Sequence, residues 1–164
     1  MKKFNDGILM QAVLFEETGT LIFYGSGAVT GVDRWIPKKT QGFVRRIVFG
    51  EGITSIGDFE FSHDFILSRN FVNLKKVTFL GDINEVGDYA FSGNQNLEEV
   101  KFCKGCRAID KMAFSNCSAL RRVVGVTKKC RLRATHIHYE HGTEIVSPFH
   151  GTPLQKRFQS HIAK

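Results

Sequence analysis

The stretch INEVGDYAFSGNQNLEEVKF, residues 83–102, decides the fold because the chain repeats it. Residues 53–79 and 106–124 carry the same order of apolar and turn residues. Phe91 and Phe114 lie 23 residues apart, and so do the leucines of the L-x-x-V-x-F elements. The step between the first two blocks is 30 residues, which is the same period plus a seven-residue insertion. A fixed period in the twenties indicates a solenoid, in which each repeat forms one coil.

Each repeat has a physical reason to stack on the next. Val77 and Phe79 point to one side of a short strand, while Lys76 and Thr78 point to the other. A single coil cannot bury its apolar side, but stacked coils share one continuous core. We therefore expect the repeated phenylalanines to form an inner ladder. These residues are Phe61, Phe91 and Phe114.

The repeat unit VGDYAFSGNQNLEEV resembles the BspA-type leucine-rich repeat, a family found in many bacterial and some protozoan proteins. Residues 19–29, GTLIFYGSGAV, are similar to its entry segment, and residues 148–154, PFHGTPL, to a terminal repeat. The likeness covers residues 19–124 and, loosely, 143–155. It implies a parallel sheet on one face, irregular segments on the other and no catalytic residues. Characterised members are mostly surface proteins that bind host or matrix proteins.

The predicted fold class is α/β. We expect a short leucine-rich-repeat solenoid with a parallel β-sheet on one face, short helical or irregular segments on the other, a β-hairpin N-cap and a helical C-cap. Residues 1–164 form one domain, with an N-terminal cap over 1–43 and repeats over 44–124. An irregular last repeat and the C-terminal cap occupy 125–164. Caps are needed because an open solenoid exposes its core.

Local patterns predict both caps. Residues 8–15 and 20–24, joined by Glu-Glu-Thr-Gly, indicate a hairpin at the N-terminal end. Near the other end, Thr152 is a suitable helix N-cap and Pro153 a suitable first helical residue. The apolar residues of that helix share one face and close the core: Leu154, Phe158 and Ile162. Between 125 and 145 the repeat fades, and we assign no structure there.

Composition favours an acidic partner. The 164 residues include 23 Lys plus Arg and 16 Asp plus Glu, for a formal net charge of +7. Such a balance suits an acidic protein, nucleic acid or an anionic surface, although charge also simply keeps proteins soluble. No run is long enough for a transmembrane helix. The first residues lack the cleavage site of a signal peptide, so an intracellular location is expected unless the chain is part of a longer secreted protein.

The outward positions of the repeated strands form the strongest candidate binding surface. Outward residues on adjacent parallel strands lie about 4.8 Å apart, so the repeat predicts one continuous patch. Its eight residues are Arg46, Val48, Lys76, Thr78, Glu99, Lys101, Arg122 and Val124. Its flank consists of Arg45, Lys75, Glu98 and Arg121. The plain alternative is a solvated charged face, but solenoids characteristically bind through such a surface.

The insertion supplies a candidate hydrophobic anchor. It adds four large apolar residues to one coil, and insertions in repeat proteins often map to the binding face. These residues are Phe65, Ile66, Leu67 and Phe71. If exposed, they would anchor an interface. The alternative is that they fold back over the core.

Other motifs do not reach the threshold for a catalytic or cofactor site. The glycines of residues 25–31 lack the spacing of a phosphate-binding loop. His136 and His138 would share a strand face, as a metal site can require, but His141 would point away unless the chain turns. There is no nucleophile elbow and no cysteine-protease signature. We predict a non-enzymatic protein without a metal or a small-molecule cofactor.

Three of the four cysteines lie within KFCKGCRAIDKMAFSNC, residues 101–117. Aligned to the repeat, Cys106 takes an inward apolar position and Cys117 a small buried one, as free cysteine often does. A zinc ribbon would need a second C-x-x-C, which the sequence lacks. Cys130 follows Cys106 by 24 residues, so one coil could bring the two close enough for a disulfide if their side chains face each other.

These observations leave two function classes open beside an enzyme, which ranks last. The first is a protein–protein interaction module that binds an acidic protein through the basic strand face, as a surface binder or an intracellular adaptor or inhibitor. The second is a basic nucleic-acid-binding protein. The phenylalanines occupy inward positions and leave few rings to stack on bases, which disfavours the second class.

Overall fold

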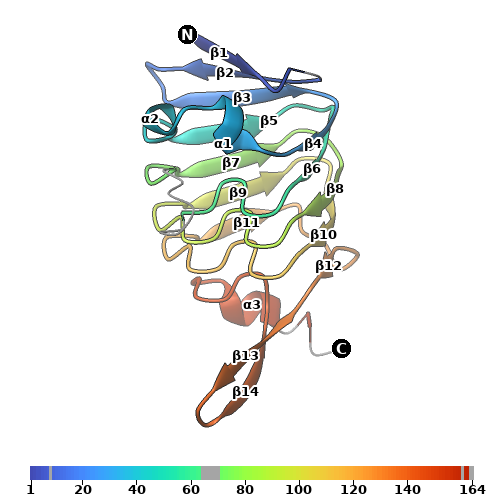
Figure 1. The fold of residues 1–164 in the computed structure, drawn as a ribbon. Helices are drawn as coiled ribbons and strands as arrows, with labels where there is room; N and C mark the ends of the chain where they lie inside the picture. The colour runs from blue at the N-terminus through green and yellow to red at the C-terminus, as the bar shows by residue number, and fades with distance from the viewer. Residues whose placement is uncertain (8, 64–70, 160, 163–164) are drawn as a thin grey trace.

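The computed structural model of the protein describes residues 1–7, 9–63, 71–159 and 161–162. Figure 1 shows a stack of coils with two sheets running along it and a hairpin at the C-terminal end. The first sheet has the strand order β1-β2-β3-β5-β7-β9-β11, and the second has the order β12-β10-β8-β6-β4. The strands β13 and β14 form a separate ribbon.

The strands are short, as the repeat length requires. The first sheet contains β1 (Lys2–Asn5), β2 (Met10–Phe15), β3 (Thr20–Gly25), β5 (Arg46–Phe49), β7 (Lys76–Phe79), β9 (Glu99–Phe102) and β11 (Arg122–Val124). The second contains β4 (Gly27–Val29), β6 (Ile53–Ile56), β8 (Ile83–Val86), β10 (Cys106–Ile109) and β12 (Arg131–Leu132). The ribbon consists of β13 (Thr135–Tyr139) and β14 (Gly142–Val146). The helices are α1 (Val32–Trp35), α2 (Lys38–Gln41) and α3 (Gln155–Gln159).

The alternation predicted for the L-x-x-V-x-F element is present in the first sheet. In β7 the side chains of Val77 and Phe79 are fully buried, while Lys76 and Thr78 are only partly buried. The strands β3, β5, β7, β9 and β11 pair in parallel with residues of equivalent repeat position opposite one another. Each coil therefore places its apolar residues directly over those of its neighbour.

The prediction of a single sheet was wrong. The segments Ile53–Ile56, Ile83–Val86 and Cys106–Ile109 form a second parallel sheet where irregular structure was expected. The helices of the described residues have only four or five residues each, so the fold is a β-solenoid rather than an α/β structure. The apolar residues at the two ends of each segment are three positions apart, and this spacing conceals the strand from a search for alternation.

The third side of each coil joins the second sheet to the next strand of the first. It has no regular secondary structure, but equivalent residues of adjacent coils form backbone hydrogen bonds along it. The Phe61 amide donates to the Ala90 carbonyl at 2.8 Å, and the Phe91 amide donates to the Ala113 carbonyl at 2.8 Å. The Phe114 amide donates in the same way to Pro148, at 3.0 Å. These coil-to-coil bonds satisfy backbone groups that the core would otherwise leave without partners.

Two stacks of aromatic rings fill the core. The predicted ladder of Phe61, Phe91 and Phe114 is confirmed, with ring centroids 5.2 and 5.3 Å apart. It continues through Phe149 and Phe158. A second stack lies against the first sheet, and edge-to-face contacts join the two. Its members are Phe23, Phe49, Phe79 and Phe102.

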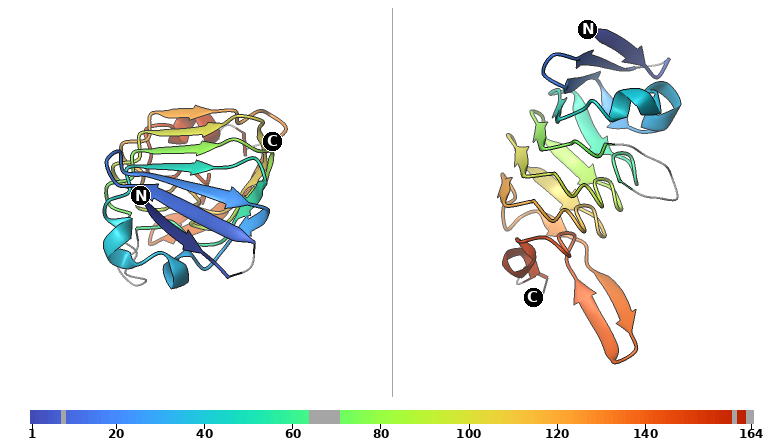
Figure 2. Two further views of the ribbon diagram at one scale, coloured as in Figure 1. Left: turned by 90° about the horizontal axis from the view of Figure 1, so that it is seen from above. Right: turned by 90° about the vertical axis from the view of Figure 1, so that its left-hand side faces the viewer.

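The N-terminal cap is the predicted hairpin with one further strand. The strands β2 and β3 pair in antiparallel orientation, and β3 joins β5 in parallel, which closes the core at that end. The strand β1, which pairs with β2 at the edge of the first sheet, was not predicted from the sequence. Figure 2 shows this antiparallel group lying across the end of the stack.

The C-terminal end explains why the repeat fades after residue 124. Phe149 stacks on Phe114, so residues 147–152 form the third side of a further coil. The ribbon β13-β14 is inserted in front of that segment and projects beyond the stack (Figure 2). The helix α3 is shorter than the predicted cap, because it ends at Gln159 before reaching Ile162. Phe158 nevertheless covers Phe149, at a ring distance of 4.1 Å.

Candidate functional site

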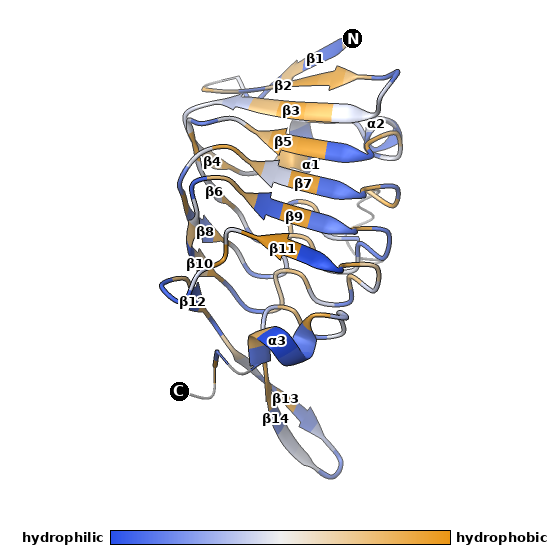
Figure 3. Ribbon diagram, turned by 180° about the vertical axis from the view of Figure 1, so that it is seen from behind, coloured by the Kyte–Doolittle hydropathy of each residue, from blue (hydrophilic) through white to orange (hydrophobic). Residues whose placement is uncertain are grey.

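The outer surface of the first sheet brings all eight predicted face residues together. Arg46, Lys76, Glu99 and Arg122 lie opposite one another on β5, β7, β9 and β11, and Val48, Thr78, Lys101 and Val124 form the next row. In Figure 3 the hydrophilic beginnings of these strands stack directly on one another. We call these eight residues the strand face.

The strand face and its flank hold most of the net charge of the chain. Seven cationic side chains and two carboxylates stand in these positions, giving a local charge of +5 against +7 for the whole chain. The cationic residues are Arg45, Arg46, Lys75, Lys76, Lys101, Arg121 and Arg122, and the carboxylates are Glu98 and Glu99.

Glu99 makes the row of cations compatible with folding. Its carboxylate lies 3.5 Å from the Lys76 amine and 3.7 Å from the Arg122 guanidinium. Partly exposed pairs of this kind contribute about 0–1 kcal/mol each, so they relieve repulsion rather than hold the fold. Among the residues that the structure describes, Arg46 and Lys101 form no ion pair. Their charge is directed to solvent or to a partner.

Of the four residues of the possible hydrophobic anchor, the structure describes Phe71, which takes the alternative position in the core. Phe71 is fully buried, and its ring packs against Phe61 at a centroid distance of 5.2 Å. It folds back over the core because the inner ladder offers it an aromatic neighbour, so it is unavailable to a partner. Phe65, Ile66 and Leu67 lie outside the described residues.

A groove beside the strand face was missed by the sequence analysis. Two hollows of about 310 and 400 Å³ share Arg45 and Asn73 in their linings. Phe43, which is 61% exposed, lines the smaller hollow. The amides of Asn73 and Asn96 donate to the carbonyls of Gly42 and Val72 in the preceding coils, both at 2.8 Å. Because each asparagine directly precedes a repeat leucine, the aligned sequence contained a signal for this row.

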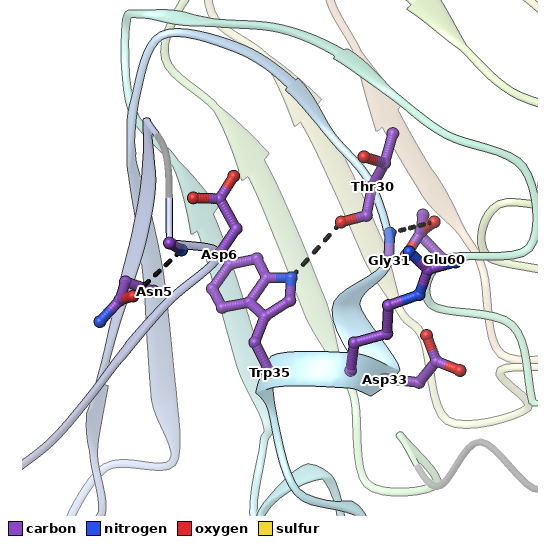
Figure 4. Close-up of a pocket in the computed structure, with 9 residues that line it drawn as sticks. Asn5, Asp6, Thr30, Gly31, Asp33, Trp35 and Glu60 are labelled. Atoms are coloured by element: carbon purple, nitrogen blue, oxygen red, sulfur yellow. Dashed lines mark hydrogen bonds between the residues drawn. The ribbon is translucent and has the colours of Figure 1, made fainter.

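The glycine-rich segment lies beside a hollow of about 820 Å³ (Figure 4). The Glu60 carboxylate accepts hydrogen bonds from the amides of Gly31 and Val32, at 2.8 and 2.9 Å. It therefore occupies the place that an anion would take at these amides. Asp6 and Asp33 also line the hollow. Three carboxylates thus share the lining with one guanidinium, that of Arg34, and this acidic excess opposes phosphate. It supports the interpretation that the glycines belong to the entry segment of the solenoid.

An ionic cluster lies on the outer surface of the second sheet, in a hollow of about 560 Å³. Arg133 bridges two carboxylates, at 3.3 Å from Glu85 and 3.0 Å from Asp110. Burial, together with the neighbouring Glu85 carboxylate, raises the pKa of Asp110 to about 7. The cluster consequently holds a proton up to neutral pH.

This proton makes stability depend on pH. Between the ordinary aspartate pKa of about 3.9 and a folded pKa near 7, the native state binds the additional proton, so stability falls as pH rises through this window. We expect the urea midpoint of the protein to decrease from pH 5 to pH 8. Asp110→Asn should flatten this dependence, whereas Asp82→Asn, at an exposed ion pair with Arg107, should preserve it. Parallel profiles for wild type and Asp110→Asn would contradict the assignment.

The histidine and cysteine motifs do not assemble a metal site in the described part of the chain. His136 and His138 share one face of β13, and His138 bonds to the Thr143 hydroxyl across the ribbon at 2.9 Å. No group of three His, Cys, Asp or Glu residues there is arranged to hold a metal ion. Cys106 and Cys117 are buried, as their repeat positions predicted, and burial raises the pKa of Cys117 to about 12.

The fold and the strand face define a short β-solenoid built from leucine-rich repeats, with a basic outer surface on its first sheet. The family model for the BspA type leucine rich repeat region matches residues 43–125, which is half of the chain. The chain therefore belongs to the BspA-type leucine-rich repeat family, as the resemblance of its repeat unit predicted.

Comparisons with curated proteins and with solved structures gave less than the family model. No curated protein matches the chain. A solved leucine-rich repeat protein from Eubacterium ventriosum is similar in structure, with 15% sequence identity and a TM-score of 0.45. The match covers 88% of this chain and 48% of the other, so the chain spans about half the length of that protein. Among the described residues there is no helix of the length and apolarity needed to cross a membrane.

Proposed function

We propose that the protein is a non-enzymatic interaction module that binds an acidic protein through its strand face. The observation that carries this proposal is the register of the first sheet, which stacks Arg46, Lys76 and Arg122 in one row and leaves Glu99 as the single carboxylate there. Leucine-rich repeat modules generally serve as protein-binding scaffolds, which supports a protein partner.

The rigidity of the strand face favours binding. Parallel pairing holds β5, β7 and β9 on both sides and the edge strand β11 on one, so the spacing between the cationic side chains is set before a partner arrives. A preorganised surface loses less conformational entropy when it binds than a flexible one. Carboxylates on an acidic protein surface would meet cations that already stand at strand spacing, about 4.8 Å apart.

Nucleic acid is the second candidate, because the local charge of +5 also suits a polyanion. The two aromatic stacks point into the core, so their rings are unavailable to stack on bases. We therefore expect any oligonucleotide binding to be purely electrostatic and to disappear as salt is raised.

A pair of titrations separates the two candidates. A fluorescein-labelled deca-glutamate peptide and a labelled single-stranded DNA of ten nucleotides are titrated with the protein, and anisotropy is followed at several salt concentrations. We expect peptide binding at low salt and loss of the DNA signal at physiological salt. DNA that remains bound at physiological salt, and more tightly than the peptide, would overturn the proposal in favour of nucleic acid. Absence of peptide binding at low salt would also contradict it.

A further inference from the structure

Cys106 and Cys130 lie side by side in adjacent coils. Cys106 is the first residue of β10, and Cys130 directly precedes β12. The strands β10 and β12 pair in parallel with Ala108 opposite Arg131, so the two cysteines are offset by one residue in register. Their side chains are buried, with 8% and 7% exposed, and each thiol shifts the pKa of the other.

The backbone geometry suits a cross-link. Parallel strands stand about 4.8 Å apart and rise about 3.3 Å per residue, so an offset of one residue separates two α-carbons by about 6 Å. Disulfides are formed across α-carbon distances of about 4.4–6.8 Å. The other nearby candidate is Cys103, which forms a C-x-x-C with Cys106 but is exposed beyond the end of β9.

The proximity of the two thiols also makes one of them the better nucleophile for disulfide exchange. The two thiols shift each other's pKa, lowering that of Cys130 and raising that of Cys106, while the Cys106 thiol donates to the Ala108 carbonyl at 3.1 Å. The thiolate is the nucleophile in disulfide exchange, so Cys130 is the attacking group. Cys117 lies fully buried below Phe91, and its raised pKa keeps it unreactive.

We propose that Cys106 and Cys130 form a reversible disulfide by exchange with a low-molecular-weight disulfide such as oxidised glutathione. The Cys130 thiolate attacks one sulfur of the small disulfide, forms a mixed disulfide and releases one small thiolate. The Cys106 thiolate then displaces the second small thiolate and closes the protein disulfide. The two cysteines together lose two protons and two electrons, and the small disulfide is reduced to two thiols.

The bond would reinforce the attachment of the shortest strand in the second sheet. The strand β12 has two residues and joins the second sheet through two register pairs, Ala108 with Arg131 and Ile109 with Leu132. The projecting ribbon β13-β14 and the last coil follow directly from it. A disulfide there fixes the end of the second sheet to its neighbour.

The test treats the native full chain with oxidised glutathione, alkylates the remaining thiols after denaturation and maps the peptides by mass spectrometry. We expect the loss of two hydrogen atoms, a linked pair of peptides containing Cys106 and Cys130, and alkylation of Cys103 and Cys117. The melting temperature should rise by about 5–10 °C and return after reduction with dithiothreitol.

Matched serine variants make the result specific. Cys103→Ser, at the exposed cysteine, should retain both the cross-link and the thermal shift. Cys130→Ser should lose both while keeping the melting temperature of the reduced protein. A link between Cys103 and Cys106 would overturn the proposal, and so would a stable mixed disulfide with glutathione or full alkylation of all four cysteines.

Discussion

Replacing Phe91 by alanine is expected to lower the free energy of unfolding by about 3–5 kcal/mol, the usual cost of removing a buried phenyl ring. Phe91 is fully buried at the centre of the inner ladder, stacked between Phe61 and Phe114. It also makes edge contacts with Phe49 and Phe79 of the other stack. Its loss leaves a cavity that borders both aromatic stacks. A domain of this size has about 5–15 kcal/mol of stability in total.

Urea denaturation followed by circular dichroism measures this effect. Phe43→Ala provides the matched control, because it makes the same chemical change at a side chain that is 61% exposed, and it should cost less than about 1 kcal/mol. If Phe91→Ala does not fold, Phe91→Leu should give a smaller, measurable loss. Equal stability of the Phe91 and Phe43 variants would show that the stacked ladder does not hold the coils together.

The ladder and the strand face could be predicted because equivalent positions in several repeats must have the same environment. Phe61, Phe91 and Phe114 occupy the same position in three successive repeats. If one of them points into the core, the other two must do so as well. The same argument fixed the register of Arg46 against Lys76, which the strand pairing confirms. Comparison of equivalent repeat positions thus predicted side-chain orientation and strand register, which local secondary-structure propensity alone does not give.

The second sheet escaped prediction because the apolar residues of its strands do not alternate along the chain. Ile53 and Ile56 are buried at the two ends of a four-residue strand, with Thr54 and Ser55 between them. This pattern does not alternate. The segment is a strand because it pairs in parallel with the equivalent segments of the neighbouring coils. Phe59 and Tyr89 illustrate the same limit, since both adopt positive φ values, of 58° and 55°, that nothing in an aromatic side chain announces.

The remaining misses arose where the repeat is interrupted. The ribbon β13-β14 separates β12 from the third side of the last coil, so residues 125–145 cannot be aligned with earlier repeats. For Phe71 the sequence left two possibilities open, an exposed anchor or a return to the core, and the structure shows the second. The sequence of an insertion does not show which of its apolar residues pack into the core. Phe71 does so, and its ring contacts that of Phe61.

Charge reversal across the strand face is expected to weaken binding of the deca-glutamate probe by on the order of 100-fold. The variant combines Arg46→Glu, Lys76→Glu and Arg122→Glu. Each substitution replaces an attraction of about 0.5 kcal/mol with a repulsion of similar size, and three such changes amount to about 3 kcal/mol. All three side chains point away from the core, so the fold should persist. Circular dichroism and thermal melting of the variant verify this.

The control carries the same change in net charge at a different place. Lys111→Glu, Lys128→Glu and Lys129→Glu alter three exposed lysines outside the first sheet, and none of the three is in an ion pair within the described residues. Any loss of binding that this control shares with the face variant reflects overall charge. The difference between the two variants therefore isolates the contribution of the strand face.

The most direct test of the central claim is the dissociation constant of the probe, measured by anisotropy at one low salt concentration for the wild type and both triple variants. We predict that the control variant stays within a few fold of wild type, while the face variant binds on the order of 100-fold more weakly. Equal dissociation constants for the two variants, with both folded, would contradict the assignment of the strand face as the binding surface.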